Sequence, residues 1–79
     1  MTLKDLKVGG KGKIIKIEAG EKALRRRIME MGLTKNTVLQ VIKSAPLGDP
    51  IEISVRGYEL TLRKADAELV TIEEVKKQW

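Results

Sequence analysis

The middle of the chain alternates apolar and polar residues with a period of two. Two such runs, 51–55 and 58–62, flank a short break in the pattern. This period is typical of half-buried strands, and a two-residue loop between such strands makes a tight hairpin. The predicted register pairs Val55 with Tyr58, Ile53 with Leu60 and Ile51 with Leu62. All six apolar side chains then fall on one face, so the pattern and the turn predict the same register.

A helical period appears once, over residues 21–31. Leu24, Ile28 and Met31 recur at positions i, i+4 and i+7, and they form one apolar stripe along the predicted helix. Gly32 follows at the position where a residue with positive φ commonly ends a helix. The sequence therefore predicts one amphipathic helix whose stripe faces a core.

Three further strands are expected at residues 13–18, 38–43 and 69–72. In the first, Ile15 and Ile17 alternate with charged residues, which predicts that these two side chains face the core. The second contains the apolar residues Val38, Leu39, Val41 and Ile42, and we expect it to be buried on both faces. Glycines before the first strand are expected in turns and at the strand entry.

The ends of the chain give weaker patterns. One helical turn is expected within residues 2–8, where Thr2 and Asp5 have the spacing of an N-terminal capping pair. A short connection, or one 3₁₀ turn, is predicted at 63–66. The last residues, 73–79, are expected to be a frayed helix or a disordered end.

These elements add up to an all-β chain with one helix. Five short strands can bury a common face by curling into a small, partly open barrel, and the helix after the first strand would plug one end of it. A chain of 79 residues is expected to form one domain. We assign that domain to residues 1–75 and a C-terminal tail to residues 76–79.

A proline-bracketed loop, Ala45–Pro50, separates the second strand from the hairpin. Pro46 and Pro50 each fix φ, so the loop is expected to be stiff. A stiff loop held out to solvent is a candidate contact surface, and it is equally well explained as a shaped turn. Leu47 is either a core plug or an exposed contact, and Asp49 either caps the turn or faces a partner.

The polar face of the predicted helix is a second candidate surface. Arg25, Arg26 and Met29 lie on this face or on its flanks. A row of arginines is usually a solvated face. An exposed methionine among arginines also suits protein docking, because both residue types are enriched at interfaces.

Composition excludes several classes of function. The chain has no histidine and no cysteine, so the usual base at neutral pH and the commonest transition-metal ligands are missing. Asp49 with Lys43 or Arg63 is the best catalytic grouping, and it lacks a nucleophile and a base. We therefore predict no enzymatic activity, no cofactor and no dedicated metal site. Surface carboxylates allow only weak binding of a divalent cation.

The formal net charge of +5 permits contact with an acidic protein surface, a membrane face or a nucleic acid. Tyr58 and Trp79 are the only aromatic residues, which argues against a single-strand nucleic-acid binder because such proteins stack bases on several rings. The first residues show no apolar signal segment, and no run approaches the length of a membrane helix. We expect a cytosolic protein without direct membrane insertion.

The chain resembles the FeoA family over nearly its whole length, from about Thr2 to Ile72. The residues that carry the resemblance are Leu3, Leu6, Gly9, Gly12, Leu24, Ile28, Met31-Gly32-Leu33, Ala45-Pro46-Leu47-Gly48-Asp49-Pro50-Ile51, Gly57, Leu62-Arg63-Lys64, Ala67 and Leu69. The resemblance implies an SH3-like β-barrel with a helix after the first strand. It also implies an accessory protein of bacterial ferrous iron uptake that contacts the cytosolic GTP-binding part of the FeoB transporter.

Two functional hypotheses follow. The first is a protein-binding accessory module whose contact surface combines Arg25, Arg26 and Met29 with the loop residues, which are Leu47, Gly48 and Asp49. The second is a small-barrel nucleic-acid-binding or metal-responsive regulatory domain, since the same barrel forms the C-terminal domain of iron-dependent repressors. Edge strands of an open barrel can also pair between copies, which allows a homodimer.

Overall fold

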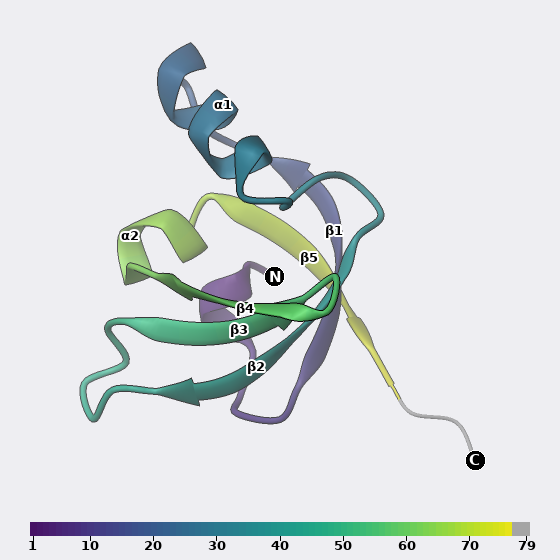
Figure 1. Ribbon diagram of the computed structural model, residues 1–79, viewed down its shortest axis with the longest axis vertical. Coiled ribbons are helices and arrows are strands. Elements are labelled where there is room, and N and C mark those ends of the chain that lie inside the picture. The colour runs from purple at the N-terminus through teal and green to yellow at the C-terminus, as the bar shows by residue number, and fades with distance from the viewer. Residues whose placement is uncertain (77–79) are drawn as a thin grey trace.

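The computed structural model describes residues 1–76 and contains one five-stranded antiparallel sheet (Figure 1). The elements in chain order are the 3₁₀ turn η1 (Leu3–Asp5), β1 (Lys11–Ile17), α1 (Lys22–Glu30), β2 (Val38–Ser44), β3 (Ile51–Val55), β4 (Tyr58–Leu62), α2 (Lys64–Ala67) and β5 (Val70–Val75). The strand order is β4-β3-β2-β1-β5. The sheet curls, yet its outer strands β4 and β5 do not pair, so the predicted five-stranded, partly open barrel is confirmed.

The hairpin of β3 and β4 has the predicted register at every pair from Ile51–Leu62 to Val55–Tyr58. Its loop residues, Arg56 and Gly57, both have positive φ, at 50° and 83°, which is the conformation of a tight type I′ turn. The register places all six apolar side chains on one face, as predicted, but Tyr58 at the end of the hairpin is not buried. That side chain is 42% exposed, because its ring reaches past the sheet toward the end of α1.

The first strand differs from its prediction in both bounds and facing. It begins at Lys11, and its buried residues are Gly12 and Ile14. Ile15 and Ile17 are half-buried, and of these two Ile17 packs against the core. A bulge between Ile14 and Lys16 shifts the pairing with β5 and turns the end of the strand.

Gly12 lies inside β1 and not at its entry. The Cδ1 atom of Ile72 lies 2.6 Å from where a Cβ at Gly12 would stand, so a side chain at this position would displace the core.

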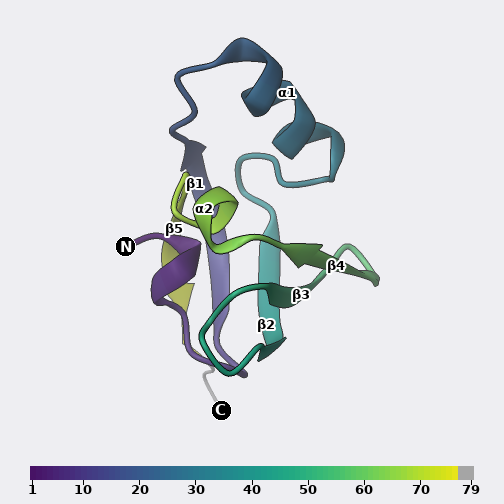
Figure 2. The same cartoon turned by 90° about the vertical axis from the view of Figure 1, so that its left-hand side faces the viewer.

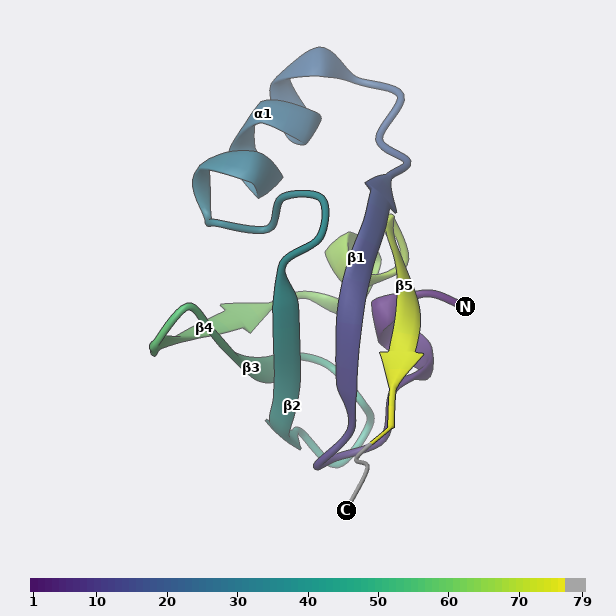
Figure 3. The same ribbon diagram turned by 90° about the vertical axis from the view of Figure 1, so that its right-hand side faces the viewer.

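The second strand is buried on one face only, so the prediction of burial on both faces is wrong. Leu39 and Val41 are buried, while Val38 is exposed and Ile42 is half-buried. The reason is visible in Figure 3, where no layer of the fold covers the outer face of β2. Pairs of adjacent apolar residues therefore do not imply two covered faces in so small a domain.

The C-terminal prediction is also corrected. Residues 73–75 are neither helical nor disordered, because they extend β5 and pair with the start of β1, for example Glu73 with Lys13. Residues 77–79 lie outside the described part of the chain. The connection before β5 is one turn of α-helix, α2, which packs Ala67 into the core.

The main helix stands at one end of the barrel, above the start of β2 and the end of β1 (Figures 1 and 2). The predicted stripe is confirmed: Ile28 is fully buried, and Leu24 and Met31 pack against the core from half-buried positions. Gly32 follows the helix with φ of 90°, as its position predicted. Because only this stripe is held, the rest of the helix surface faces solvent.

Candidate functional site

The structure separates the residues predicted to form one contact surface into two groups. They are Arg25, Arg26 and Met29 on α1, and Leu47, Gly48 and Asp49 in the loop between β2 and β3. Figures 1 to 3 all place α1 and this loop at opposite ends of the long axis. The two groups therefore cannot form a single continuous patch on one copy of the chain.

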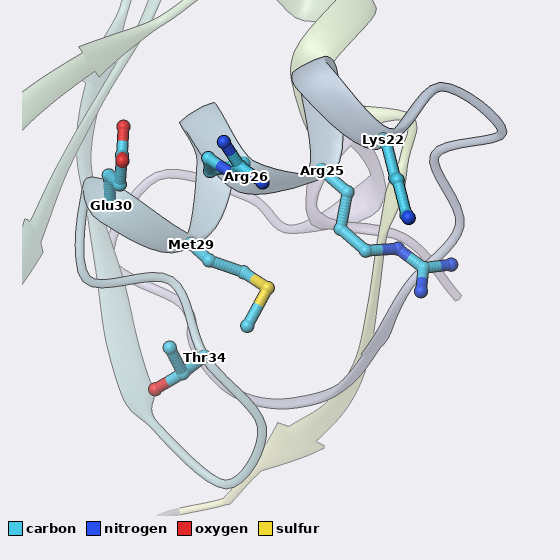
Figure 4. A pocket seen from close by; sticks show the side chains of 6 residues that line it. All are labelled: Lys22, Arg25, Arg26, Met29, Glu30 and Thr34. Atoms are coloured by element: carbon cyan, nitrogen blue, oxygen red, sulfur yellow. The ribbon is translucent and has the colours of Figure 1, made fainter.

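The three helix residues do lie together, around an open pocket of about 420 Å³ (Figure 4). Met29 is 46% exposed, and its side chain points from α1 into the space between Arg25 and Thr34. Lys22, Arg26 and Glu30 complete the lining. The pocket thus has an apolar centre and a mainly cationic rim.

A second pocket of about 360 Å³ adjoins the first. It shares Arg25, Met29 and Thr34 with the first pocket, and it adds Lys35 and the end of β1, residues 15–17. The two pockets together form what we call the α1–β1 groove. Ile15 and Ile17, which the sequence predicted to be core residues, form part of its wall. Both are half-buried, and Ile17, which lies opposite the buried Val70, also packs against the core.

The groove is strongly cationic. Its lining includes five positive side chains and one carboxylate, namely Lys16, Lys22, Arg25, Arg26, Lys35 and Glu30. The Lys16 ammonium lies 2.9 Å from a carboxylate oxygen of Glu18, which neutralises part of this charge. The remaining cations are exposed, so the groove favours a negatively charged partner.

The helix wall of the groove is held by Asp66, a residue that no sequence pattern indicated. Its carboxylate accepts from Arg27 Nη2 on α1 at 3.2 Å and from Arg63 Nε at 3.4 Å. The Asp66 side chain is only 9% exposed, so this is a shielded tie between α1 and α2. An aspartate flanked by alanines in a short connection gave no signal of this long-range pairing.

The hairpin tip holds the other wall. Tyr58 donates its hydroxyl hydrogen to the Met31 carbonyl at the end of α1. The Arg56 guanidinium donates to the hydroxyl oxygens of Thr34, at 3.1 Å, and Thr37, at 2.9 Å. The segment after α1, which borders the groove, is therefore fixed by β4 and the hairpin turn.

The proline-bracketed loop exposes its apolar residue fully. Leu47 is 89% exposed, so the alternative that it plugs the core is rejected. Gly48, with φ of 79°, donates its N–H to the Ala45 carbonyl at 2.7 Å and closes the turn. The Asp49–Pro50 peptide bond is cis.

Asp49 is engaged within the domain. Its Oδ1 accepts the backbone N–H of Lys64 at 3.0 Å, at the first residue of α2. It therefore caps a helix fifteen residues away and not its own turn. Lys43 faces Glu52 at 4.0 Å, and Arg63 faces Asp66, so the grouping of Asp49 with either cation does not form.

A cluster of metal-ligating side chains and a membrane-spanning helix are two further site types to consider in residues 1–76. No three acidic, histidine or cysteine side chains in this range are grouped closely enough to hold a metal ion. No helix in the same range has the length and apolar character that a membrane span needs.

Comparison with known proteins places this geometry in a family. The FeoA domain family matches residues 1–74. A Porphyromonas gingivalis Fe(2+) transport protein A/Fe(2+) transporter FeoB fusion protein is 34% identical over 73 residues, which cover 92% of this chain and 8% of that protein. This chain thus spans a small part of that relative's length.

Solved structures agree with this placement. A FeoA-like protein from Clostridium acetobutylicum superposes with a TM-score of 0.88 at 35% identity, covering 100% of this chain and 91% of the other. A zinc-complexed FeoA from Stenotrophomonas maltophilia, a prokaryotic SH3 domain protein, gives 0.81 at 24% identity, covering 92% and 89%. The second likeness confirms the predicted SH3-like fold. The family match and the first likeness show that this chain belongs to the FeoA family.

Proposed function

We propose that this FeoA domain is a non-catalytic docking module of bacterial ferrous iron transport, and that it binds the cytosolic GTP-binding part of a FeoB-type transporter. The observation that supports this best is the relative in which Fe(2+) transport protein A and FeoB form one polypeptide. Fusion keeps two modules at a high effective concentration, which favours partners that contact one another. A domain that docks on such a partner works in the cytoplasm.

The α1–β1 groove suits this role better than any other described surface. Met29 supplies an exposed, adaptable apolar contact, and Arg25 and Arg26 supply donors beside it. Methionine and arginine are both enriched in protein interfaces. The Leu47 loop provides a second, separate contact at the opposite end of the domain, where an exposed leucine stands on a shaped turn.

Binding to the purified cytosolic part of a FeoB-type transporter tests the proposal by calorimetry. Met29→Ser and Arg26→Glu are expected to weaken binding by about tenfold or more, since each removes a contact at the groove. Val8→Ser and Lys7→Glu change an exposed apolar residue and an exposed cation in the segment before β1, far from α1, and serve as matched controls.

Leu47→Ser, measured in the same assay, decides whether the loop takes part in the contact. Loss of affinity only in the groove variants would confine the interface to α1 and the end of β1. Absence of binding by the unaltered domain, with the transporter fragment shown to bind GTP, would reject the proposed function.

A further inference from the structure

The last residues of β1 have a strand neighbour on one side only. On the β2 side, pairing reaches Lys13, and the next residue, Ile14, exchanges hydrogen bonds with Asn36 and Thr37 at 2.7 and 2.9 Å. Beyond Ile14 the chain before β2 turns away, with Asn36 at φ of 72°. On the other side, pairing with β5 continues to Ile17. The end of β1 therefore presents an open edge inside the sheet.

The open backbone groups belong to Ile17. Glu18 donates its N–H to the Leu69 carbonyl at 2.7 Å, so Glu18 points its backbone groups toward the β5 side. Backbone direction alternates along an antiparallel strand, and Ile17, opposite Val70, must point its N–H and C=O away from β5. On that side the structure gives Ile17 no hydrogen-bond partner within residues 1–76.

This open edge faces the α1–β1 groove. The pocket beside it is lined by residues 15–17, by Met29 and Arg25 from α1, and by Thr34 and Lys35 from the following loop. If β2 began several residues earlier, its first residues would lie between these walls. In the structure this space is an open pocket. Unpaired strand edges are templates for another strand, and here the edge lies between apolar side chains.

The positive charge around the open edge favours a partner strand that carries negative charge. Lys16, Arg25 and Lys35 line the pocket with no carboxylate among its lining residues. The side chains of Ile15, Ile17 and Met29 supply the apolar contacts. A matching segment is extended, alternates apolar with acidic residues, and turns its carboxylates toward the rim, because side chains alternate between the two sides of a strand.

We propose that the α1–β1 groove is a strand-addition site, which takes a short, extended, acidic–apolar segment of a partner protein onto the open edge at Ile17. The added segment pairs with the Ile17 N–H and C=O and lies under Met29. For the identity of the partner this inference rests on the proposed function, which makes the segment a part of the transporter's cytosolic portion. The binding chemistry itself rests only on the edge and on the charge of its walls.

Amide hydrogen exchange in the intact domain tests the proposal directly. In the free domain we expect fast exchange at the Ile17 amide and slow exchange at the Glu18 amide, which is bonded to Leu69. A synthetic peptide that alternates glutamate with valine should slow exchange at Ile17 by about tenfold or more. A peptide that alternates lysine with valine should leave the Ile17 rate unchanged.

Two variants separate the backbone and charge contributions. Ile17→Pro removes the outward N–H while sparing the neighbouring bond from Glu18 to Leu69, and it should abolish capture of the acidic peptide. Arg25→Glu should weaken that capture by about tenfold or more, since it places like charges together. Lys7→Glu makes the same charge change far from the groove and should leave capture unchanged. If either variant fails to fold, the amide exchange measured on the unaltered domain still tests the proposal.

The transporter fragment, used as a second probe, distinguishes the two proposals. Protection of the Ile17 amide by this fragment supports both the docking function and the strand-addition mode. Binding of the fragment without Ile17 protection overturns strand addition and leaves the docking function standing. Protection by the acidic peptide, combined with no binding of the fragment, supports the strand-addition site and rejects the transporter as its partner. Failure of both probes to protect Ile17 overturns the inference.

Discussion

Replacing Gly32 by alanine tests how the segment bordering the groove is held. Gly32 has φ of 90°, a conformation that costs an L-residue about 1–2 kcal/mol. A Cβ at this position would also stand well inside contact distance of the Tyr58 hydroxyl, which bonds the Met31 carbonyl. Moving Tyr58 aside loses that hydrogen bond, worth about 1 kcal/mol net. We expect Gly32→Ala to lower the free energy of unfolding by about 2–3 kcal/mol.

Gly57→Ala provides a matched control. Gly57 has nearly the same backbone angle, with φ of 83°, and nothing lies within 4 Å of the position that an alanine methyl group would occupy there. This variant therefore reports the backbone cost alone, and we expect a loss of about 1–2 kcal/mol. Urea unfolding followed by circular dichroism measures both variants, with an unchanged m-value as the sign that only stability differs.

The hydroxyl contact is isolated by a double-mutant cycle. Tyr58→Phe removes the oxygen, and the next ring atom, Cζ, lies 3.5 Å from the added methyl position, which is an ordinary contact. In the phenylalanine background, Gly32→Ala should therefore cost only the backbone term of about 1–2 kcal/mol, like Gly57→Ala. Equal costs of Gly32→Ala in the tyrosine and phenylalanine backgrounds would refute this account of the contact.

Three further outcomes are expected. Asp66→Asn should lower the unfolding free energy by about 1–2 kcal/mol in urea melts, because two charge-assisted bonds from arginines are weakened. The Thr2 backbone N–H holds the pKa of Asp5 below its usual value, so the stability that Asp5 contributes is full above the unfolded-state pKa and is lost as the pH falls through the lowered folded-state pKa. Melts across acid pH should show the difference in unfolding free energy between wild type and Asp5→Asn shrinking between these two pKa values, and a constant difference would contradict this account. Leu47→Ser should change stability by less than about 0.5 kcal/mol, whereas Leu62→Ala, in the core, should cost about 2–4 kcal/mol in the same melts.

Local patterns predicted the elements that local physics controls. The hairpin register follows from alternation and from a two-residue turn, both of which are properties of neighbouring residues. The stripe of α1 follows from helical spacing around Ile28, and the helix end follows from Gly32. In each case the feature depends on residues within one short stretch of sequence.

The errors arose where the facing of a residue depends on distant elements. Ile15 and Ile17 alternate as core residues do, yet only Ile17 packs against the core, and a bulge against β5 breaks the alternation between Ile14 and Lys16. Val38 is apolar but exposed, because no layer covers the outer face of β2. Residues 73–75 look like a charged tail, and they form a strand only because β1 is present to pair with them.

The sequence by itself determined the strands and helix, the stiffness of the loop and the cationic, exposed character of α1, since these depend on residue type and short-range spacing. It also contained the family resemblance. Only the tertiary structure decided that the α1 residues and Leu47 lie at opposite ends, that Asp49 caps α2, and that the end of β1 keeps an open edge. Those properties depend on which segments pack together across the whole chain, and no local pattern encodes that packing.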